Sequence, residues 1–397
     1  MEIKLPQSVE YIIEKIEACG FKADVVGGPV RDFLLGNTPF DYDITTSATP
    51  QKIKEIFSDE RTLDIGLKHG TVTLMLGGDS YEITTYRVDG EYLDSRHPEN
   101  VEFTSSLEED LARRDFTMNA VSYNPERGFC DPFSGKEDIK NRLIRAVGEA
   151  ERRFEEDALR IMRGARFAAT LGFSVEEKTR EAMSATSHLL ANIARERIYT
   201  EWKKLLSGRF AYSALSEFSD IIKRFLPELD FSALPNERAF SEADFYTRQM
   251  SFFYLSCGSE SALRFETAMR RLKTDRVTRE SGALILSSVG KYDNKTPFGR
   301  RIMLASLGDK ELAVGLLRLE GLLGITDAEC ERALLDELLD GVAYRISDLK
   351  VDGKDISALG YRGEKIGKTL KALLFAVAAS EVENDREKLL SFVAQIG

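Results

Sequence analysis

The sequence predicts an α+β protein: an N-terminal head, with a small mixed or antiparallel sheet and helices, followed by an elongated all-α neck, body and tail. Seven of the ten prolines lie at or before Pro132. The same third of the chain holds two runs typical of β-strands, Thr71–Leu76 and Tyr81–Tyr86. In the remainder, apolar residues recur at helical spacing, as in 156–171 and 197–206. This contrast indicates a mixed head and a helical remainder.

Chain length requires more than one domain, because 397 residues exceed what a single compact core usually holds. Prolines and polar residues near 227–235 and 293–297 mark breaks within the helical part. We therefore expect four domains: a head (1–140), a neck (141–206), a body (207–310) and a tail (311–397).

Composition indicates a cytoplasmic protein. The longest apolar runs, such as Ala372–Ala379, are far shorter than the ~20 residues that span a bilayer. The N-terminus does not resemble a secretion signal, and the four cysteines have no metal-ligand spacing. A net charge of −11 counts against nucleic-acid binding over the whole surface, but one basic face would suffice. Nothing points to a membrane or to an obligate protein partner.

The segment Val25–Asp43 reads as a strand, a Gly27-Gly28 turn and a helix. Glycines at such a turn let backbone N–H groups approach a phosphate, so Gly28 is a candidate nucleotide-binding residue. Arg31, in the first turn of the helix, could hold a triphosphate oxygen. Taken alone, an ordinary turn explains these residues equally well.

Two carboxylates follow in Asp41-Tyr42-Asp43. Alternation along a strand would place Asp41 and Asp43 on one face, where they repel unless a cation neutralises them. Two Mg²⁺ ions held there would activate an incoming 3′-hydroxyl and stabilise leaving pyrophosphate. Glu82, in the second β-run, is the candidate third catalytic carboxylate. A solvated acidic turn and a surface strand residue are the alternatives.

Three blocks together resemble a known family. GGPVRDFLLG…DYDI is followed by RRDFTMNA at 113–120 and by EDALR at 156–160. Their order and spacing resemble the class II tRNA nucleotidyltransferases of Gram-positive type, which share the DNA polymerase β nucleotidyltransferase fold with bacterial poly(A) polymerases. The resemblance implies template-independent addition of C, C and A to the tRNA 3′ end. It also implies that tRNA, CTP and ATP are the partners, with release of pyrophosphate.

The same resemblance implies roles for the second block. Arg114 and Asp115 would bond the sugar hydroxyls and so select ribonucleotides, and Asn119 would support their loop. A helix-capping aspartate with a paired arginine is the alternative.

The third block would recognise the base. Placed i, i+3 on one helix, Asp157 and Arg160 would project together and mimic the edge of a template base. Arg163 and Arg166, farther along the same side, would face the triphosphate. A surface ion pair is the alternative reading of this spacing.

Two further segments receive roles from the resemblance. The loop Tyr86–Leu107 is similar to a flexible loop that complete CCA-adding enzymes use to change from C to A, with Arg87, Asp89 and Arg96 as its functional charges. The turn Leu359–Ile366 would hold the tRNA elbow, through the basic residues Arg362 and Lys365 within it and Lys368 just after it. A plain exposed loop and a solvated helix face are the alternatives.

The competing functions are a poly(A) polymerase, an enzyme that adds only the terminal A, and a non-catalytic RNA-binding module. The segments Ile65–Val72, Arg195–Leu206 and Val351–Leu390 resemble Gram-positive CCA-adding enzymes, which favours complete CCA addition. A module without catalysis would have lost a metal carboxylate or the base-reading pair, and both are present.

Overall fold

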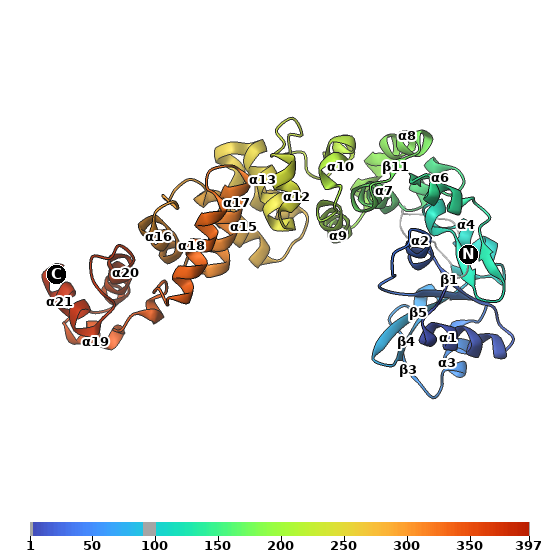
Figure 1. The fold of residues 1–397 in the computed structure, drawn as a ribbon, viewed down its shortest axis with the longest axis horizontal. Coiled ribbons are helices and arrows are strands. Elements are labelled where there is room, and N and C mark those ends of the chain that lie inside the picture. The colour runs from blue at the N-terminus through green and yellow to red at the C-terminus, as the bar shows by residue number, and fades with distance from the viewer. Residues whose placement is uncertain (1–2, 90–100, 397) are drawn as a thin grey trace. The chain divides into compact units, whose positions relative to one another are not determined.

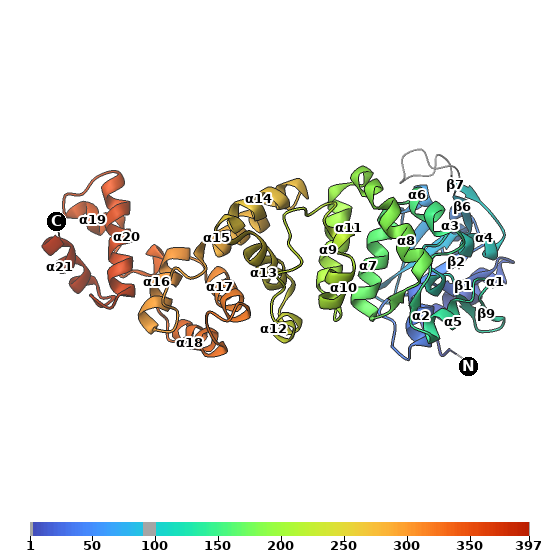
Figure 2. The same cartoon turned by 90° about the horizontal axis from the view of Figure 1, so that it is seen from above.

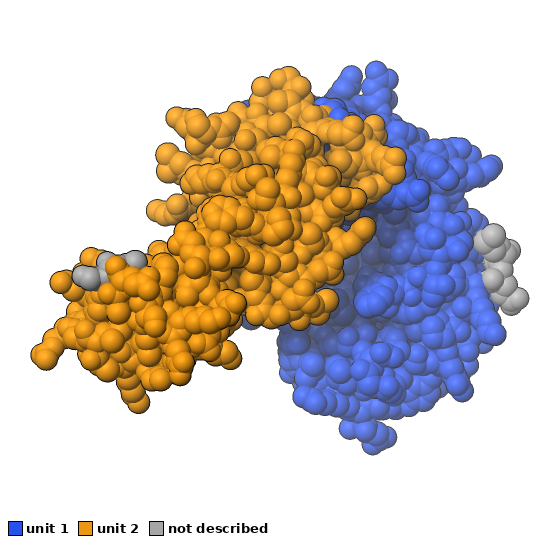
Figure 3. Space-filling model, turned by 60° about the vertical axis from the view of Figure 1, so that its left-hand side comes forward, with its two compact units in different colours: residues 1–225 blue, residues 226–397 orange. Residues whose placement is uncertain are grey.

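The structure, a computed structural model, describes residues 3–89 and 101–396. It divides after residue 225 into two compact units, residues 1–225 and 226–397, which Figure 3 colours separately. The first contains a sheet and helices and the second is helical, which confirms the predicted α+β class. The four domains expected from the sequence, with boundaries at 140, 206 and 310, stay a prediction.

A seven-stranded sheet forms the N-terminal part of the first unit (Figure 1). The strand order is β3-β4-β5-β2-β1-β8-β9; β2 and β5 run parallel, and the other neighbouring pairs are antiparallel. The strands are β1 (Ala23–Val26), β2 (Asp43–Thr46), β3 (Arg61–Leu63), β4 (Thr71–Leu76), β5 (Asp79–Thr85), β8 (Ser122–Asn124) and β9 (Gly128–Cys130). The two β-runs identified in the sequence are therefore β4 and, within a few residues, β5.

Helices and short strand pairs make up the rest of the first unit. The helices are α1 (Gln7–Ala18), α2 (Gly28–Leu34), α3 (Pro50–Ile56), α4 (Leu107–Ala112), α5 (Gly135–Lys140), α6 (Ala150–Glu156), α7 (Leu159–Leu171), α8 (Glu177–Thr186), α9 (Arg195–Leu206), α10 (Ala211–Glu217) and α11 (Ser219–Ile222). The 3₁₀ turns are η1 (Leu67–His69), η2 (Thr117–Asn119) and η3 (Ser187–Asn192). Two small sheets pair β6 (Arg87–Asp89) with β7 (Val101–Phe103), and β10 (Leu143–Ile144) with β11 (Ser174–Val175).

The sheet has one apolar face, covered by α1 and α3. Val25, Ile44 and Ile83 of its central strands belong to the same buried cluster as residues of these two helices. Because successive side chains of a strand alternate between faces, Asp43 and Glu82 belong to the opposite face. The fold thus buries one side of β2 and β5 and leaves their polar side available for a site.

The helix α7 is buried along most of its length and packs against α9. Trp202 of α9 is fully buried, with its ring centroid 6.0 Å from that of Phe225. The helices α7 and α9 lie side by side in Figures 1 and 2, and α6, which precedes α7 along the chain, also contacts α7. The segment expected to be an all-helical neck is therefore helical apart from the short β10–β11 pair.

The second unit consists of ten α-helices and two 3₁₀ turns in its described residues. They are α12 (Glu237–Glu242), α13 (Phe245–Cys257), η4 (Gly258–Glu260), α14 (Ser261–Arg271), α15 (Arg276–Ser288), α16 (Pro297–Leu307), α17 (Lys310–Leu322), α18 (Ala328–Leu339), η5 (Ile346–Asp348), α19 (Gly353–Ala358), α20 (Glu364–Ala378) and α21 (Arg386–Ile396). Side-chain caps begin several of them; Thr296 caps α16 just before Pro297 at its first position. No helix in the described part of the chain combines the length and apolar character needed to cross a membrane.

Candidate active site

A cavity of about 500 Å³ opens on the polar face of the first unit. Its walls come from the β1–α2 turn, the start of β2, the α4–η2 segment, and the helices α7 and α9. Eight lining residues are positively charged and four are negatively charged, so the cavity is basic in a chain of net charge −11. The lining residues are Gly27, Gly28, Pro29, Arg31, Asp41, Asp43, Arg113, Arg114, Asp115, Asn119, Asp157, Leu159, Arg160, Arg163, Arg166, Phe167, Arg197 and Lys204.

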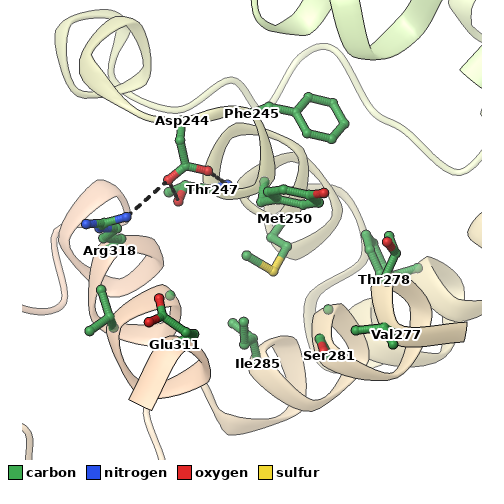
Figure 4. A pocket seen from close by; sticks show the side chains of 15 residues that line it. Asp244, Phe245, Thr247, Met250, Val277, Thr278, Ser281, Ile285, Glu311 and Arg318 are labelled. Carbon is green, nitrogen blue, oxygen red and sulfur yellow. Dashed lines mark hydrogen bonds and ion pairs between the residues drawn. The ribbon is translucent and has the colours of Figure 1, made fainter. Parts of the chain in front are cut away.

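A second cavity, of about 480 Å³, lies in the second unit between α13, α15 and α17 (Figure 4). Its floor includes Met250 and Ile285, and an ion pair of 3.9 Å between Asp244 and Arg318 lies at its edge. It contains none of the motif residues. The candidate active site is therefore the basic cavity of the first unit.

The two metal-binding candidates lie at the start of β2, although not on one strand as predicted. Asp43 is the first residue of β2, whereas Asp41 lies in the bend before it, so strand alternation does not orient Asp41. Both residues still line the cavity. Glu82 is paired with Asp43 in the parallel β2–β5 register, on the adjacent strand where a third carboxylate was expected. It does not itself line the cavity.

Desolvation, more than the neighbouring carboxylates, changes the acidity of Asp43. Its side chain is open to solvent, yet the surrounding protein raises its pKa to about 6 through desolvation, and Asp41 and Glu82 add to this rise. Arg114 opposes the rise. Asp43 is therefore a carboxylate whose charge is poorly compensated, which a cation would correct.

The two carboxylates of Asp41 and Asp43 fit a divalent ion that is also coordinated by the phosphates of a bound nucleotide. Within the described residues, no group of three or more His, Cys, Asp or Glu side chains is close enough to hold a metal ion by itself. Mg²⁺ typically takes one or two carboxylates and completes its shell with waters and substrate phosphates. Asp41 and Asp43 match that requirement.

The predicted strand–turn–helix around the two glycines is confirmed. Gly27 links β1 to α2 with a φ of 77°, which favours glycine, and a Cβ there would lie 3.1 Å from Nη1 of Arg114. Arg31 points across the turn; its Nη1 donates to Asn119 Oδ1 at 2.9 Å, and its Nε and Nη2 donate to Asp32. Asn119 thus holds Arg31.

Asp115 is a buried residue of the cavity wall and is already paired. Its Oδ2 accepts from Nε of Arg163 at 2.7 Å, and its Oδ1 accepts from Asn119 Nδ2 at 3.1 Å. Burial alone would raise the pKa of Asp115, but Arg163 and Asn119 outweigh it and hold the pKa at about 2. The sequence did not predict the Asp115–Arg163 pair, which joins the ribose block to α7.

The expectation that Asp157 and Arg160 share one helix is wrong. The helix α6 ends at Glu156 and α7 begins at Leu159; Asp157 between them has extended backbone, with φ −140° and ψ 101°. Asp157 Oδ1 accepts from the backbone N–H of Leu159 at 3.0 Å, which satisfies one free donor of the new helix. Both side chains nevertheless line the cavity, so a helix break brings them together.

Arg160 is buried and held firmly. Its Nη1 donates to Glu156 Oε2 at 2.9 Å and to the carbonyl of Arg153, and its Nη2 donates to the carbonyl of Arg113 at 2.9 Å. These contacts use both N–H groups of Nη1 and one of Nη2. The donors on Nε and the second N–H of Nη2 are the ones left to reach a ligand.

Comparisons with known proteins decide the family. A family model described as the Poly A polymerase head domain matches residues 23–145, and one described as the probable RNA and SrmB-binding site of polymerase A matches residues 172–232. The CCA-adding enzyme of Geobacillus kaustophilus is 36% identical over 393 residues, covering 97% of this chain and 95% of its own. That of Lactobacillus helveticus is 34% identical over 400 residues, covering 97% and 96%. The crystal structure of the Bacillus stearothermophilus CCA-adding enzyme in complex with CTP aligns with a TM-score of 0.87 and 32% identity, covering 99% of this chain and 98% of that one.

The chain belongs to the CCA-adding enzyme family. The family model of the head is named after poly(A) polymerases, but the relatives that match nearly the full length of the chain are CCA-adding enzymes. Membership makes the chain a tRNA nucleotidyltransferase of class II, within a superfamily whose members use divalent metals.

Several residues that line the cavity received no role from the sequence, among them the three side chains Arg197, Lys204 and Phe167. Arg197 and Lys204, on α9, lie two helical turns apart and therefore share one face. Arg197 Nη2 lies 3.5 Å from Asp157 Oδ2. The third, Phe167, has the guanidinium of Arg166 3.8 Å from its ring centroid. The spacing of Arg197 and Lys204 was a usable signal, whereas the position of Phe167 beside three arginines was not visible in the sequence.

Arg166 is less free than a triphosphate ligand was expected to be. Its Nε lies 2.7 Å from Oε2 of the buried Glu201, and burial lowers its pKa. Arg163, its neighbour one turn earlier, is bonded to Asp115. The two arginines line the cavity as predicted but are held by carboxylates of the protein.

The structure describes only part of the predicted flexible loop, Tyr86–Leu107. Arg87 begins β6 and its Nη1 donates to the carbonyl of His69, while the backbone of Asp89 pairs with that of Val101. The segment therefore leaves and rejoins the head as a pair of short strands. Arg96 lies outside the described residues.

Of the predicted tRNA-binding turn, residues 359–363 lie between α19 and α20, whereas residues 364–366 form the start of α20. Arg362, Lys365 and Lys368 are all exposed, and Lys368 Nζ lies 3.5 Å from Glu364 Oε2 in a surface pair. All three belong to the second unit, whereas every residue that lines the basic cavity belongs to the first.

Proposed function

We propose that this chain adds C, C and A in sequence to the 3′ end of tRNA, using CTP and ATP without a template and releasing pyrophosphate. The observation that carries the proposal is that one basic cavity contains the carboxylates Asp41 and Asp43 together with Asp157 and Arg160. A related enzyme, 32% identical, has been crystallised with CTP. The reaction takes place in the cytoplasm on this proposal.

Asp41 and Asp43 would hold Mg²⁺. When bound there, Mg²⁺ lowers the pKa of the attacking 3′-hydroxyl and neutralises charge on the leaving pyrophosphate. Glu82, in register with Asp43, adds negative charge that favours the ion. Arg31, Arg163 and Arg166 neutralise the triphosphate from the other walls, and Gly28 lets it approach the backbone closely.

Base selection rests on Asp157 and Arg160. A carboxylate accepts a hydrogen bond from the exocyclic amino group that cytosine and adenine share, and a guanidinium donates to the adjacent ring nitrogen. Uracil and guanine carry a carbonyl and a ring N–H at those positions. They would leave both side chains unpaired in a partly buried site, at a cost of ~1–3 kcal/mol for each unpaired group.

Sugar selection rests on Arg114 and Asp115, with Asn119 in support. Asp115 is bonded to Arg163, so an incoming ribose either shares that carboxylate or displaces Arg163 toward the triphosphate. Either path links recognition of the sugar to the placement of an arginine on the phosphates. The charged segment with Arg87, Asp89 and Arg96 would adjust the cavity between C and A addition, and Arg362, Lys365 and Lys368 would hold the tRNA elbow.

The test is a product ladder resolved nucleotide by nucleotide. Transcripts of tRNA lacking CCA, lacking only A, and an unrelated RNA are each given CTP and ATP with Mg²⁺. The proposal expects three additions to the first, one to the second and none to the third. Long poly(A) on unrelated RNA would instead identify a poly(A) polymerase, and A addition alone would identify an A-adding enzyme.

Controls separate the chemistry from binding. Chelation of divalent ions, or Asp43→Ala, should abolish addition while CTP still binds through the arginines. Full transfer by Asp43→Ala protein would contradict the metal assignment.

A further inference from the structure

Asp110 on α4 is a fully buried carboxylate that the proposed mechanism does not use. Its two oxygens accept five hydrogen bonds from three parts of the head. They come from Thr45 Oγ1 at 3.2 Å, from the backbone N–H of Arg87 at 3.4 Å, from Nε and Nη2 of Arg113 at 3.0 and 2.6 Å, and from Nη2 of Arg114 at 3.2 Å. Asp110 therefore joins these three parts of the head, and we call it a structural junction.

The first connection of this junction is to Arg114, which lines the cavity. Asp110 binds Nη2 of Arg114, while Nη1 lies beside the Gly27 turn, close enough that a Cβ on Gly27 would be 3.1 Å away. The charge of Arg114 also lowers the pKa of Asp43. Arg114 is therefore held at one end by Asp110 and faces the phosphate turn and the metal carboxylate at the other.

The second connection leads to the base-reading arginine. The Arg113 guanidinium is bonded to Asp110, and the Arg113 carbonyl accepts from Nη2 of Arg160 at 2.9 Å. The neighbouring carbonyl, of Ala112, accepts from Arg153 at 3.2 Å. These carbonyls end α4, where cations are favoured by the helix dipole. Displacement of the α4 end would therefore move Arg160.

The third connection is to the catalytic strand and the loop. Thr45 follows Asp43 by two residues on β2, so it lies on the same face of the sheet. Arg87 begins β6. Burial alone would raise the pKa of Asp110, but Arg114 and Arg113 outweigh it and leave the pKa below its usual value, so the group is ionised at neutral pH.

We infer that Asp110 is a positioning residue for nucleotide selection. It holds Arg114, which would meet the sugar, and the α4 end that carries Arg160, which would meet the base, at a set distance from Asp43. The inference rests on the proposed function. It concerns a residue outside the cavity lining, to which no role in catalysis was assigned from the sequence.

Asp110→Asn tests the inference with little change in shape. The amide keeps one acceptor but replaces the other with a donor, which would face arginine or threonine donors. The quantity to measure is kcat/KM for CTP divided by kcat/KM for dCTP, on tRNA lacking CCA. Since both substrates are measured on one preparation, any inactive fraction cancels. We expect the preference for CTP to fall by about tenfold or more, because a misplacement of roughly 1 Å can cost on the order of a hundredfold in rate.

A double-mutant cycle separates positioning from general weakening. Arg114→Ala removes the group through which Asp110 is inferred to act on the sugar. In that background, Asp110→Asn should leave the CTP/dCTP ratio unchanged. Equal reductions of the ratio with and without Arg114 would overturn the inference, as would an unchanged ratio in the single variant.

Asp24→Asn is the matched control. Asp24 is a buried carboxylate of the same unit, bonded to Tyr86 and Arg127, and it does not line the cavity. It should lower thermal stability without changing the ratio. If Asp110→Asn gives no folded protein, Asp110→Glu tests the same link, because it keeps the charge but shifts the carboxylate relative to Arg114, and an unchanged CTP/dCTP ratio there overturns the inference. Failure of the wild-type protein to extend tRNA would instead contradict the proposed function.

Discussion

At the scale of single residues, the site is organised by carboxylates that hold arginines. Asp115 holds Arg163, Glu201 holds Arg166, and Glu156 holds Arg160. An arginine fixed in this way loses less side-chain entropy when a nucleotide arrives. The cavity is therefore prepared for an anionic ligand, although the chain as a whole is acidic.

The raised pKa of Asp43 predicts a pH-dependent affinity for metal. Below about pH 6 the folded, nucleotide-free protein carries a proton on Asp43, so the carboxylate is neutral and an ion must displace that proton. Mg²⁺ affinity measured by calorimetry should therefore fall as the pH is lowered from 7.5 to 5.5. Asp43→Asn should bind weakly at both values. A wild-type affinity that is constant over this range would contradict the assignment of Asp43 as a ligand.

The proposed role of Asp157 predicts that its substitution changes the base preference of the enzyme. In Asp157→Asn the amide can donate as well as accept, so the carbonyl of uracil gains a partner. Incorporation of UTP relative to CTP should rise by roughly tenfold or more, the effect of removing an unpaired buried group. Competition between the two labelled nucleotides would measure it. Asp220→Asn, at an ion pair with Arg180 away from the cavity, serves as the control.

At the scale of elements, close packing of short helices fixes the loop that carries Asn119. Gly135 begins α5, and a Cβ on it would lie 2.1 Å from the backbone carbonyl of Thr117 in η2. Any larger residue must therefore move η2, and with it the Asn119 side chain that joins Arg31 to Asp115.

Gly135→Ala should accordingly destabilise the protein by about 1–3 kcal/mol, as overpacking does, and weaken CTP binding. Thermal unfolding and CTP titration would measure the two effects. Gly321→Ala is the matched control, because Gly321 lies within α17 with open space around its Cα. There alanine should be neutral or stabilising. Unchanged stability in Gly135→Ala would show that η2 can shift freely.

At the scale of the whole molecule, the two compact units carry different tasks on our proposal. All residues that line the basic cavity belong to residues 1–225, and the basic turn belongs to residues 226–397. Binding of tRNA through the second unit should therefore be separable from nucleotide binding in the first.

The variant with Arg362→Glu, Lys365→Glu and Lys368→Glu tests this separation. It should raise KM for tRNA and leave KM for CTP unchanged. The dependence of tRNA affinity on salt should also weaken, by about 0.7–0.9 in log–log slope for each phosphate that the protein no longer neutralises. Lys310→Glu, at an exposed lysine of the same unit, should have little effect. Equal changes in both KM values would contradict the division.

The sequence by itself determined the α+β class, the Gly27 turn, the carboxylates at β2 and the charged blocks of the cavity. These features depend on local periodicity, turn chemistry and residue type, all of which can be read directly from the sequence. Recognition of the family followed from the order of the blocks.

Only the tertiary structure decided how those charges are arranged. It placed Asp41 before β2 instead of on it, broke the expected helix at Asp157, paired Asp115 with Arg163, and made Asp110 a junction. The partners in such pairs are separated by up to dozens of residues, and packing selects them from many side chains of equal charge. The local sequence identifies an arginine, but the tertiary structure determines which carboxylate binds it.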